Sequence, residues 1–448
     1  MKKLTKTLRV VAINLALLAV LVEAISIATY FFQTGEFFYR HSSNRKLVGL
    51  TTPTGAINQG SEQAATPQQL HPYFGFIDRV GMGHRFSFSQ VNHISNNFGF
   101  ASTYSYPFRR QNPDQFIVGV FGGSVAQNYS FFEMERNILA AELRKLPALA
   151  DKEIIILPFA VGAYKQPQQL IVLSYFLSIG QDLDLVVNID GFNEVVLSSV
   201  NERDGFERSM PYKYVIVPLV RLASSNVSEA ELQLTLDIIR NKKQLENSIK
   251  SIETSRFATG YLISWIRAKF AQRRYRQQLI ELDRLQTVGI NSGQLNTQFP
   301  ARPQLDEDRR FQEIVADWST SSLLMKQLLD QRNISYFEFI QPNQYQPTGR
   351  IFSESEGAIA IVESKGYRPG VSKGYPLLLA ELPRLQQAGV NVQSAINVFD
   401  KVDDAVYEDD CCHYNERGNQ IFGEFVASAI AQALRKDKRY GSSIAGPK

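Results

Sequence analysis

Short apolar runs alternate with helical segments along two stretches of the chain. Continuous apolar runs of this length are typical of buried strands. Four such runs are QFIVGVF (115–121), EIIILPFA (153–160), LDLVVNID (183–190) and ISYFEFIQP (334–342). The segments with helical character are residues 131–146, 167–180, 375–389 and 416–436, and residues 396–400 form a candidate edge strand. Strands that alternate with helices predict an α/β domain in which helices cover both faces of a parallel sheet.

Residues 226–300 interrupt this alternation with a long, mostly polar segment of helical pattern. It carries one apolar stripe, made of Leu262, Ile263, Ile266 and Phe270. Five basic residues with no acid between them accompany the stripe: Arg267, Lys269, Arg273, Arg274 and Arg276. The simplest interpretation is a solvated helical insertion. The alternative is that the basic cluster contacts a membrane surface or an anionic polymer.

The N-terminal region holds the longest apolar run, from Val10 to Phe32. As a helix these residues would extend about 35 Å, enough to cross a hydrocarbon core of about 30 Å. Basic residues before Val10 place that end in the cytoplasm by the positive-inside rule. A cleaved signal peptide and a buried core helix are the competing interpretations. A carboxylate within a membrane costs about 2.5–3.5 kcal/mol, so we expect Glu23 to be paired or protonated.

The domain organisation that follows has four parts. Residues 1–32 are a cytoplasmic tip and a transmembrane anchor, and residues 33–70 are a polar linker rich in Thr, Gln, Gly and Ala. Residues 71–440 form the α/β domain, with residues 226–300 as its insertion, and residues 441–448 are a flexible tail. A retained anchor would leave the α/β domain outside the cytoplasm, on the periplasmic or outer face of a membrane.

Composition limits the classes of partner and of covalent framework. The formal net charge of +4 is too small to indicate a nucleic-acid partner. The two cysteines, Cys411 and Cys412, are adjacent in sequence and cannot form a disulfide framework. They are either small buried residues or a strained disulfide with each other.

Polar residues follow the predicted strands at the positions where α/β proteins form their sites. Ser124 follows the first strand, Gly162 the second and Asn193 the third, while Asp410 and His413 directly precede the closing helix. Because sites in parallel sheets lie beyond the carboxyl ends of the strands, we expect these residues to converge.

These residue types have complementary chemical roles in acyl transfer. A serine hydroxyl needs a base within hydrogen-bond reach, and His413 is the only one of five histidines with a carboxylate three residues earlier. That carboxylate, Asp410, would hold the imidazole tautomer and stabilise the imidazolium. The backbone N–H groups of Ser124 and Gly162 and the side-chain amide of Asn193 are three candidate donors to an oxyanion.

The order of these blocks resembles the SGNH (GDSL-like) hydrolase superfamily. The matching blocks are Gly122-Gly123-Ser124-Val125, Gly162, Gly191-Phe192-Asn193-Glu194 and Asp410-Cys411-Cys412-His413. Many members have Asp where this chain has Gly123, and the third block usually ends in Asp where this chain has Glu194. The resemblance covers about half of the chain, residues 110–200 and 330–436.

The resemblance implies a flavodoxin-like three-layer α/β/α fold and a serine esterase or O-acyltransferase that needs no cofactor and no metal. Ser124, Asp410 and His413 would form the catalytic triad, and Gly123, Gly191 and Glu194 would support the site. The substrate would be a small molecule or an envelope or exported carbohydrate that carries ester-linked acyl groups, acetyl above all.

Three other interpretations of the same residues remain. The chain could be a non-catalytic envelope scaffold or binding protein that retains the fold. Glu408 and Asp409 could join Asp410 and His413 in a metal site, although no second histidine is near in sequence. The G-x-S-x-A sequence around Ser124 is also similar to an α/β-hydrolase elbow, but there the acid and the histidine usually come from separate loops.

Overall fold

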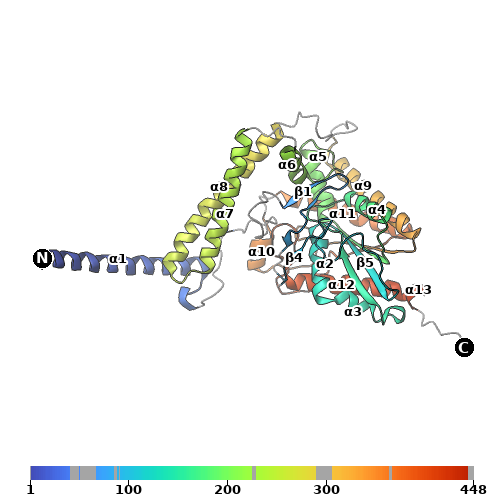
Figure 1. The fold of residues 1–448 in the computed structure, drawn as a ribbon, viewed down its shortest axis with the longest axis horizontal. Helices are drawn as coiled ribbons and strands as arrows, with labels where there is room; N and C mark the ends of the chain where they lie inside the picture. The colour runs from blue at the N-terminus through green and yellow to red at the C-terminus, as the bar shows by residue number, and fades with distance from the viewer. Residues whose placement is uncertain are drawn as a thin grey trace. The chain divides into compact units, whose positions relative to one another are not determined.

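A computed structural model describes residues 2–40, 50, 67–84, 88–89, 91–223, 229–288, 305–362 and 366–441 (Figure 1). The chain divides into two compact units. The first, called here the helical unit, contains residues 1–56 and 221–293. The second, called here the α/β unit, contains residues 57–220 and 294–448.

A five-stranded parallel sheet is the centre of the α/β unit, which confirms the predicted mixed α/β class. Its strands are β5 (Gln115–Gly122), β6 (Glu153–Pro158), β7 (Leu185–Asp190), β8 (Ser335–Ile340) and β9 (Asn391–Ser394). They lie in the order β6-β5-β7-β8-β9, and every pair is parallel. Counted along the chain this order is 2-1-3-4-5, as in doubly wound sheets that bind ligands where the order reverses.

Four of the predicted strands are present, and the fifth is displaced. All residues of β5, β7 and β8 are buried, which is why they form continuous apolar runs. The edge strand is β9 and not residues 396–400, which form turns. The prediction was wrong there because β9 has the sequence NVQS, in which only Val392 is fully buried. An edge strand of this kind has no apolar run to recognise.

Two groups of helices lie on opposite sides of the strands (Figure 1). One group is α2 (Ser124–Arg136), α3 (Ile138–Leu143) and α12 (Glu416–Lys436). The other is α4 (Gln168–Ser178), α9 (Glu307–Asp330) and α11 (Tyr367–Gln387). Shorter helices are η2 (Pro147–Leu149), η3 (Asn193–Leu197), α5 (Ser198–Arg203), α6 (Lys213–Ala223), α10 (Glu354–Ala360) and α13 (Lys438–Gly441).

Short antiparallel strands and aromatic loops precede the sheet. They are β1 (Gln68–His71) with β2 (Gly75–Asp78), and β3 (Gly83–His84) with β4 (His93–Ile94). Aromatic residues of this region pack on α4 and on the loop after β6; for example, Phe100 contacts both Phe159 and Phe176. The region thus adds an aromatic layer to the core of the α/β unit.

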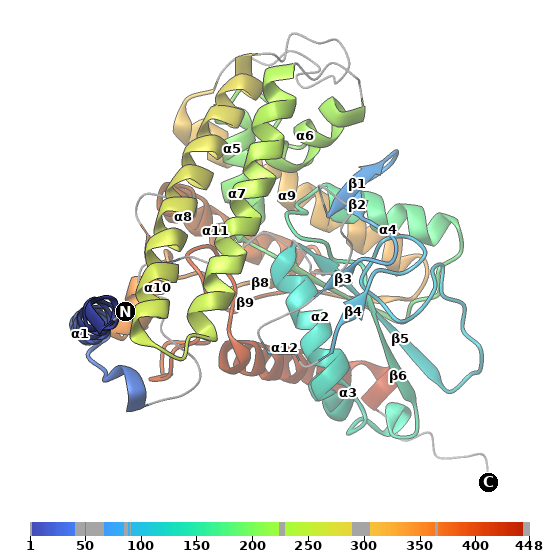
Figure 2. The ribbon, with the colours of Figure 1, turned by 60° about the vertical axis from the view of Figure 1, so that its left-hand side comes forward.

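The helical unit consists of α1 (Lys2–Thr34), η1 (Phe38–Arg40), α7 (Glu229–Glu253) and α8 (Ala258–Val288). Helices α7 and α8 pack side by side as a hairpin (Figure 2). Tyr30 and Phe38 are buried against α8, where both rings contact Tyr261. The segment predicted as an insertion of the α/β domain therefore belongs to the same unit as the N-terminal helix, because its buried apolar face packs there.

The N-terminal helix is long and apolar enough to cross a membrane over Ala16–Thr34, a property that signal sequences share. The predicted linker overlaps ordered structure at both ends, since α1 ends at Thr34, Phe38 is buried and β1 begins at Gln68. Residues 41–49 and 51–66 of that linker, residues 289–304, and residues 442–448 of the predicted tail lie outside the described residues.

Candidate functional site

Ser124 lies at the point where the central strand passes into a helix. Strand β5 ends at Gly122, and Ser124 is the first residue of α2. Between them, a Cβ atom on Gly123 would lie only 2.0 Å from Nδ2 of Asn193 and 3.0 Å from the Tyr164 carbonyl oxygen. Only glycine therefore allows the Asn193 amide to approach this turn.

The structure brings His413 to Ser124 across 289 residues of sequence. Nε2 of His413 lies 2.7 Å from Oγ of Ser124. Nδ1 of the same ring lies 2.5 Å from Oδ2 of Asp409. The three side chains form one continuous hydrogen-bonded chain of carboxylate, imidazole and hydroxyl, which is the arrangement that activates a serine nucleophile.

The carboxylate in this chain is Asp409 and not the predicted Asp410. Oδ1 of Asp409 accepts hydrogen bonds from the backbone N–H groups of Cys411, Cys412 and His413, at 3.0, 3.1 and 3.2 Å. The carboxylate is thus the centre of the turn, and its second oxygen is left for the imidazole. Asp410 contributes its backbone carbonyl, which accepts from Oη of Tyr345 at 2.9 Å.

The imidazole and the carboxylate shift each other's protonation in opposite directions. Burial disfavours the charged imidazole, but the negative charge of Asp409 and its hydrogen bond outweigh this and raise the pKa of His413 above its usual value. Burial likewise opposes ionisation of Asp409, but the facing imidazole and the three backbone N–H groups lower the pKa of this carboxyl. The pair therefore stabilises an imidazolium, the state that a general base reaches during catalysis.

Asn193 stands beside the serine, at the start of η3. Its Nδ2 donates to the carbonyl oxygen of Tyr164 at 2.8 Å. An amide nitrogen has two hydrogens, so one remains for a ligand. Gly162 is on the same loop as Tyr164, and no atom lies within 4 Å of where its Cβ would stand. Of the predicted oxyanion donors, the structure brings Ser124 and Asn193 together at Gly123 and places Gly162 on the loop that holds Asn193.

Glu194 holds the turn that carries Asn193. Its Oε2 accepts from the Gly191 N–H at 2.7 Å, and its Oε1 accepts from the Gln166 N–H and the Gln169 side chain at 3.3 and 3.2 Å. A buried glutamate thus reaches three donors around the end of β7. The supporting role expected for Gly191 and Glu194 stays a prediction, and these hydrogen bonds are the geometry it would use.

Two further buried carboxyl groups, Asp190 and Glu338, belong to the same region of the α/β unit, and no sequence motif singles them out. Asp190 and Glu338 both accept from Nε1 of Trp318, at 3.1 and 2.9 Å. Burial raises the pKa of Asp190, Glu194 and Glu338, and for Asp190 the neighbouring carboxyls raise it further. Asp190 is in β7 and Glu338 is in β8, and within these apolar runs neither residue suggests a functional role. Nε2 of Gln169 donates to both Asp190 and Glu194, so this network is connected to the turn that carries Asn193.

The cysteine pair lies within the Asp409–His413 turn. The two Sγ atoms are 3.1 Å apart and both thiols are free. Cys412 is buried, whereas Cys411 is partly exposed. In the part of the chain that the structure describes, no group of three or more His, Cys, Asp or Glu residues could hold a metal ion.

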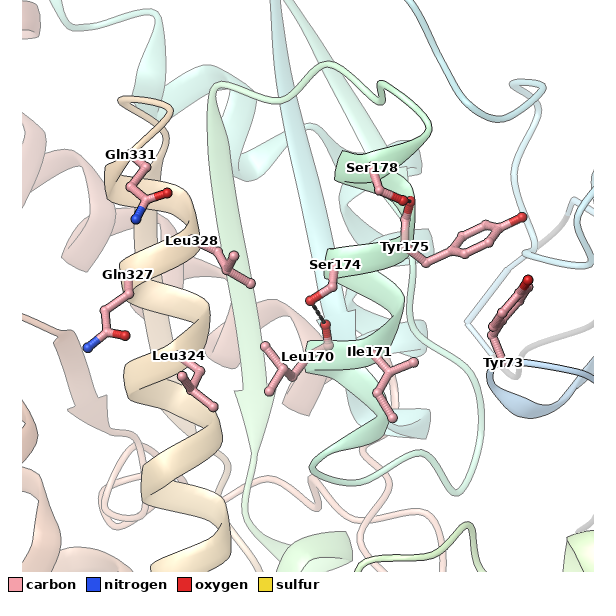
Figure 3. A pocket seen from close by; sticks show the side chains of 10 residues that line it. All are labelled: Tyr73, Leu170, Ile171, Ser174, Tyr175, Ser178, Leu324, Gln327, Leu328 and Gln331. Carbon is pink, nitrogen blue, oxygen red and sulfur yellow. Dashed lines mark hydrogen bonds between the residues drawn. The ribbon is translucent and has the colours of Figure 1, made fainter.

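Two hollows of the α/β unit lie outside the triad. An apolar groove of about 610 Å³ runs between α4 and α9, where Leu170, Leu324 and Leu328 face one another (Figure 3). A smaller polar hollow of about 210 Å³ includes Gln344, whose Nε2 donates to the Asp409 carbonyl at 3.1 Å. That hollow therefore adjoins the back of the turn that carries the acid and the histidine.

Comparisons with known proteins find little similarity to this chain. No family model and no curated protein matches the sequence. Among solved structures, one match is the crystal structure of a "putative acylhydrolase" from Bacteroides fragilis NCTC 9343. The two chains share 10% identity with a TM-score of 0.33, over 73% of this chain and 90% of the other.

Proposed function

We propose that the α/β unit is a serine hydrolase of the SGNH type, an esterase or O-acyltransferase whose triad is Ser124, His413 and Asp409. The observation that carries the proposal is the unbroken hydrogen-bonded chain at the carboxyl edge of the sheet, 2.7 Å from Oγ to Nε2 and 2.5 Å from Nδ1 to the carboxylate. A scaffold that had only retained the fold would not need these three side chains in register.

The proposed reaction begins with attack of Ser124 Oγ on the carbonyl carbon of an ester. Nε2 of His413 accepts the hydroxyl proton as the C–O bond forms, and Asp409 stabilises the imidazolium. The carbonyl oxygen becomes an oxyanion near the N–H of Ser124, the N–H of Gly162 and the remaining amide hydrogen of Asn193. The N-terminal end of α2 adds a favourable dipole to this position.

The second half of the reaction returns the enzyme to its starting state. The imidazolium donates its proton to the leaving alkoxide, and an acyl group stays on Ser124. His413 then removes a proton from water or from an acceptor hydroxyl, which attacks the acyl-enzyme. With water the net reaction is hydrolysis, and with another alcohol it is acyl transfer. The side chain of His413 is 24% exposed, so an acceptor has access to the imidazole.

The resemblance of the four sequence blocks to SGNH hydrolases supports the class of substrate. We propose ester-linked acyl groups, acetyl above all, on a small molecule or on an envelope or exported carbohydrate. We also propose that α1 is a retained anchor and that the α/β unit lies outside the cytoplasm. The basic flank before Val10 and the length of the apolar run support this topology.

An assay of product partition tests this function and separates its two forms. The purified full chain is given p-nitrophenyl acetate alone and then with an oligosaccharide acceptor, and free acetate and acetylated sugar are both measured. We expect p-nitrophenol release that Ser124→Ala and His413→Ala each abolish. Acetylated sugar would identify a transferase, and acetate alone an esterase. Equal release by the parent and by Ser124→Ala would refute the proposed nucleophile.

A further inference from the structure

The α7–α8 hairpin of the helical unit contacts α1 at Glu23. Both carboxylate oxygens of Glu23 accept hydrogen bonds from the first turn of α8, from the N–H of Ala258 at 2.7 Å and of Thr259 at 2.9 Å. The hydroxyl of Tyr39 also donates to Glu23. One turn further along α1, the Ser26 and Thr259 hydroxyls are 3.4 Å apart. The tip of the hairpin thus caps the one acidic residue of the apolar run.

Among the side chains of α1 that the structure describes, the buried ones lie beyond Glu23. Ser26 and Tyr30 are buried against the hairpin, whereas the described apolar residues before Glu23 are exposed, for example Leu17, Val20 and Leu21. In Figure 1 the hairpin starts at the C-terminal part of α1 and leads away from the preceding part of that helix. If α1 crosses a membrane along its normal, the hairpin extends sideways, over the surface from which α1 emerges.

The length of α1 sets the depth of the hairpin tip. A hydrocarbon core of about 30 Å takes about 20 helical residues, so a span that begins at Val10 ends near Thr29. Glu23 lies six residues before that end, about 9 Å along the helix axis. Interfacial amphipathic helices sink about 5–10 Å into the boundary between headgroups and acyl chains. For a span that begins at Val10, where the apolar run starts, the tip is therefore at the depth of that boundary; Phe257 in the tip is 65% exposed.

Helix α8 presents a face of matching chemistry. Its exposed residues Ile263, Ile266, Arg267, Phe270, Arg273 and Arg274 follow helical spacing and share one side. Phe270 is 64% exposed, whereas Ala268 and Ala271 on the other side of α8 are buried. No acidic residue occurs between Ala258 and Ile280. Apolar side chains beside arginines, without compensating acids, are what an anionic lipid surface binds.

We propose that the α7–α8 hairpin is a second membrane contact of this protein. Its tip and the exposed face of α8 lie in the headgroup layer of the leaflet from which α1 emerges. The apolar side chains contact acyl chains there, and Arg267, Arg273 and Arg274 bind anionic headgroups. This inference rests on α1 being a retained anchor and is independent of the chemistry at Ser124.

Spin labels on the full chain in lipid nanodiscs test the contact. In a Cys411→Ser/Cys412→Ser background, a nitroxide is attached at Phe270→Cys, and the matched control is Gln244→Cys at an exposed site of α7. Accessibility to oxygen, which partitions into lipid, is compared with accessibility to a water-soluble nickel chelate. In bilayers with phosphatidylglycerol we expect the label at 270 to favour oxygen and the label at 244 to favour the chelate.

The charge requirement forms the second arm of the experiment. Arg267→Glu/Arg273→Glu/Arg274→Glu should shift the label at 270 toward the chelate, and so should bilayers of phosphatidylcholine alone. A label at 270 as open to the chelate as the control overturns the contact, and one closed to both reagents indicates a protein partner and overturns it too. If neither the charge reversals nor the change of lipid alters the accessibility of the label, the proposed binding of anionic headgroups is refuted. Failure of the parent to enter nanodiscs overturns the anchor on which the inference rests.

Discussion

The replacement of Asp409 by Asn is the most informative perturbation of the site, because it removes one contact and keeps the rest. Asn retains a carbonyl oxygen that can accept from the three backbone N–H groups that Oδ1 now binds. Its NH₂ group, however, replaces the oxygen that lies 2.5 Å from Nδ1 of His413. An amide donor there favours the tautomer with hydrogen on Nε2, which cannot accept the proton of Ser124.

The expected loss in turnover is about 10⁴-fold, the size seen when a triad carboxylate becomes an amide. This loss corresponds to about 5.4 kcal/mol of transition-state stabilisation, at 1.36 kcal/mol for each factor of ten. Asp410→Asn is the matched control. It makes the same chemical change at the adjacent residue, and the backbone carbonyl of residue 410 still accepts the hydrogen bond from Tyr345. We expect Asp410→Asn to lose less than tenfold.

The assay is kcat/KM for p-nitrophenyl acetate as a function of pH, with thermal melting to show that both variants are folded. In the parent, Asp409 raises the pKa of His413, so the acid limb should lie above the usual imidazole range. Without that charge the imidazolium is less stable, and the limb of the residual Asp409→Asn activity should move to lower pH. A large loss in Asp410→Asn and a small one in Asp409→Asn would refute the assignment.

Three further outcomes follow from the same geometry and from the sequence of the anchor. Asn193→Ala removes one oxyanion donor and should lower kcat about 10²–10³-fold, with little change in melting temperature. Gly123→Ala places a methyl group 2.0 Å from the Asn193 amide, so activity should fall at least as far and the melting temperature should fall too, as circular dichroism can measure. A reporter that is active only in the cytoplasm should be inactive when fused after Lys448, and full activity would overturn the proposed topology.

Local patterns were sufficient to predict the buried strands of the sheet, because burial dictates their apolar sequences. Strands β5, β7 and β8 are buried on both faces, so their sequences are nearly continuous apolar runs. Because these strands could be located from their sequences, the residues that directly follow them, such as Ser124 and Asn193, could be located as well. The edge strand β9 was not predicted, because its half-exposed sequence NVQS contains no apolar run.

The choice between two adjacent acids shows where local patterns fail. Asp409 and Asp410 are adjacent in the chain, and the D-x-x-H spacing favours Asp410. The folded turn selects the first, because the Asp409 carboxylate accepts from the following backbone N–H groups and also contacts the imidazole. A spacing rule does not contain this information, since it depends on backbone dihedral angles within the turn.

Long-range pairing was the other limit of the sequence. Glu23 was expected to be paired or protonated, but its partners, Ala258 and Thr259, are 235 and 236 residues away. The same contact explains why the segment interpreted as an insertion belongs to the helical unit and not to the α/β unit. No local periodicity distinguishes a solvated helix from one that packs on a distant partner.

The central claim is that Ser124 is a nucleophile activated by His413, and covalent labelling with a fluorophosphonate probe tests it most directly. Intact mass and peptide mapping should show one probe on Ser124 of the parent, none on Ser124→Ala, and much slower labelling of His413→Ala and Asp409→Asn. Rapid labelling of Ser124→Ala, or a His413→Ala variant that reacts as fast as the parent, would contradict the account.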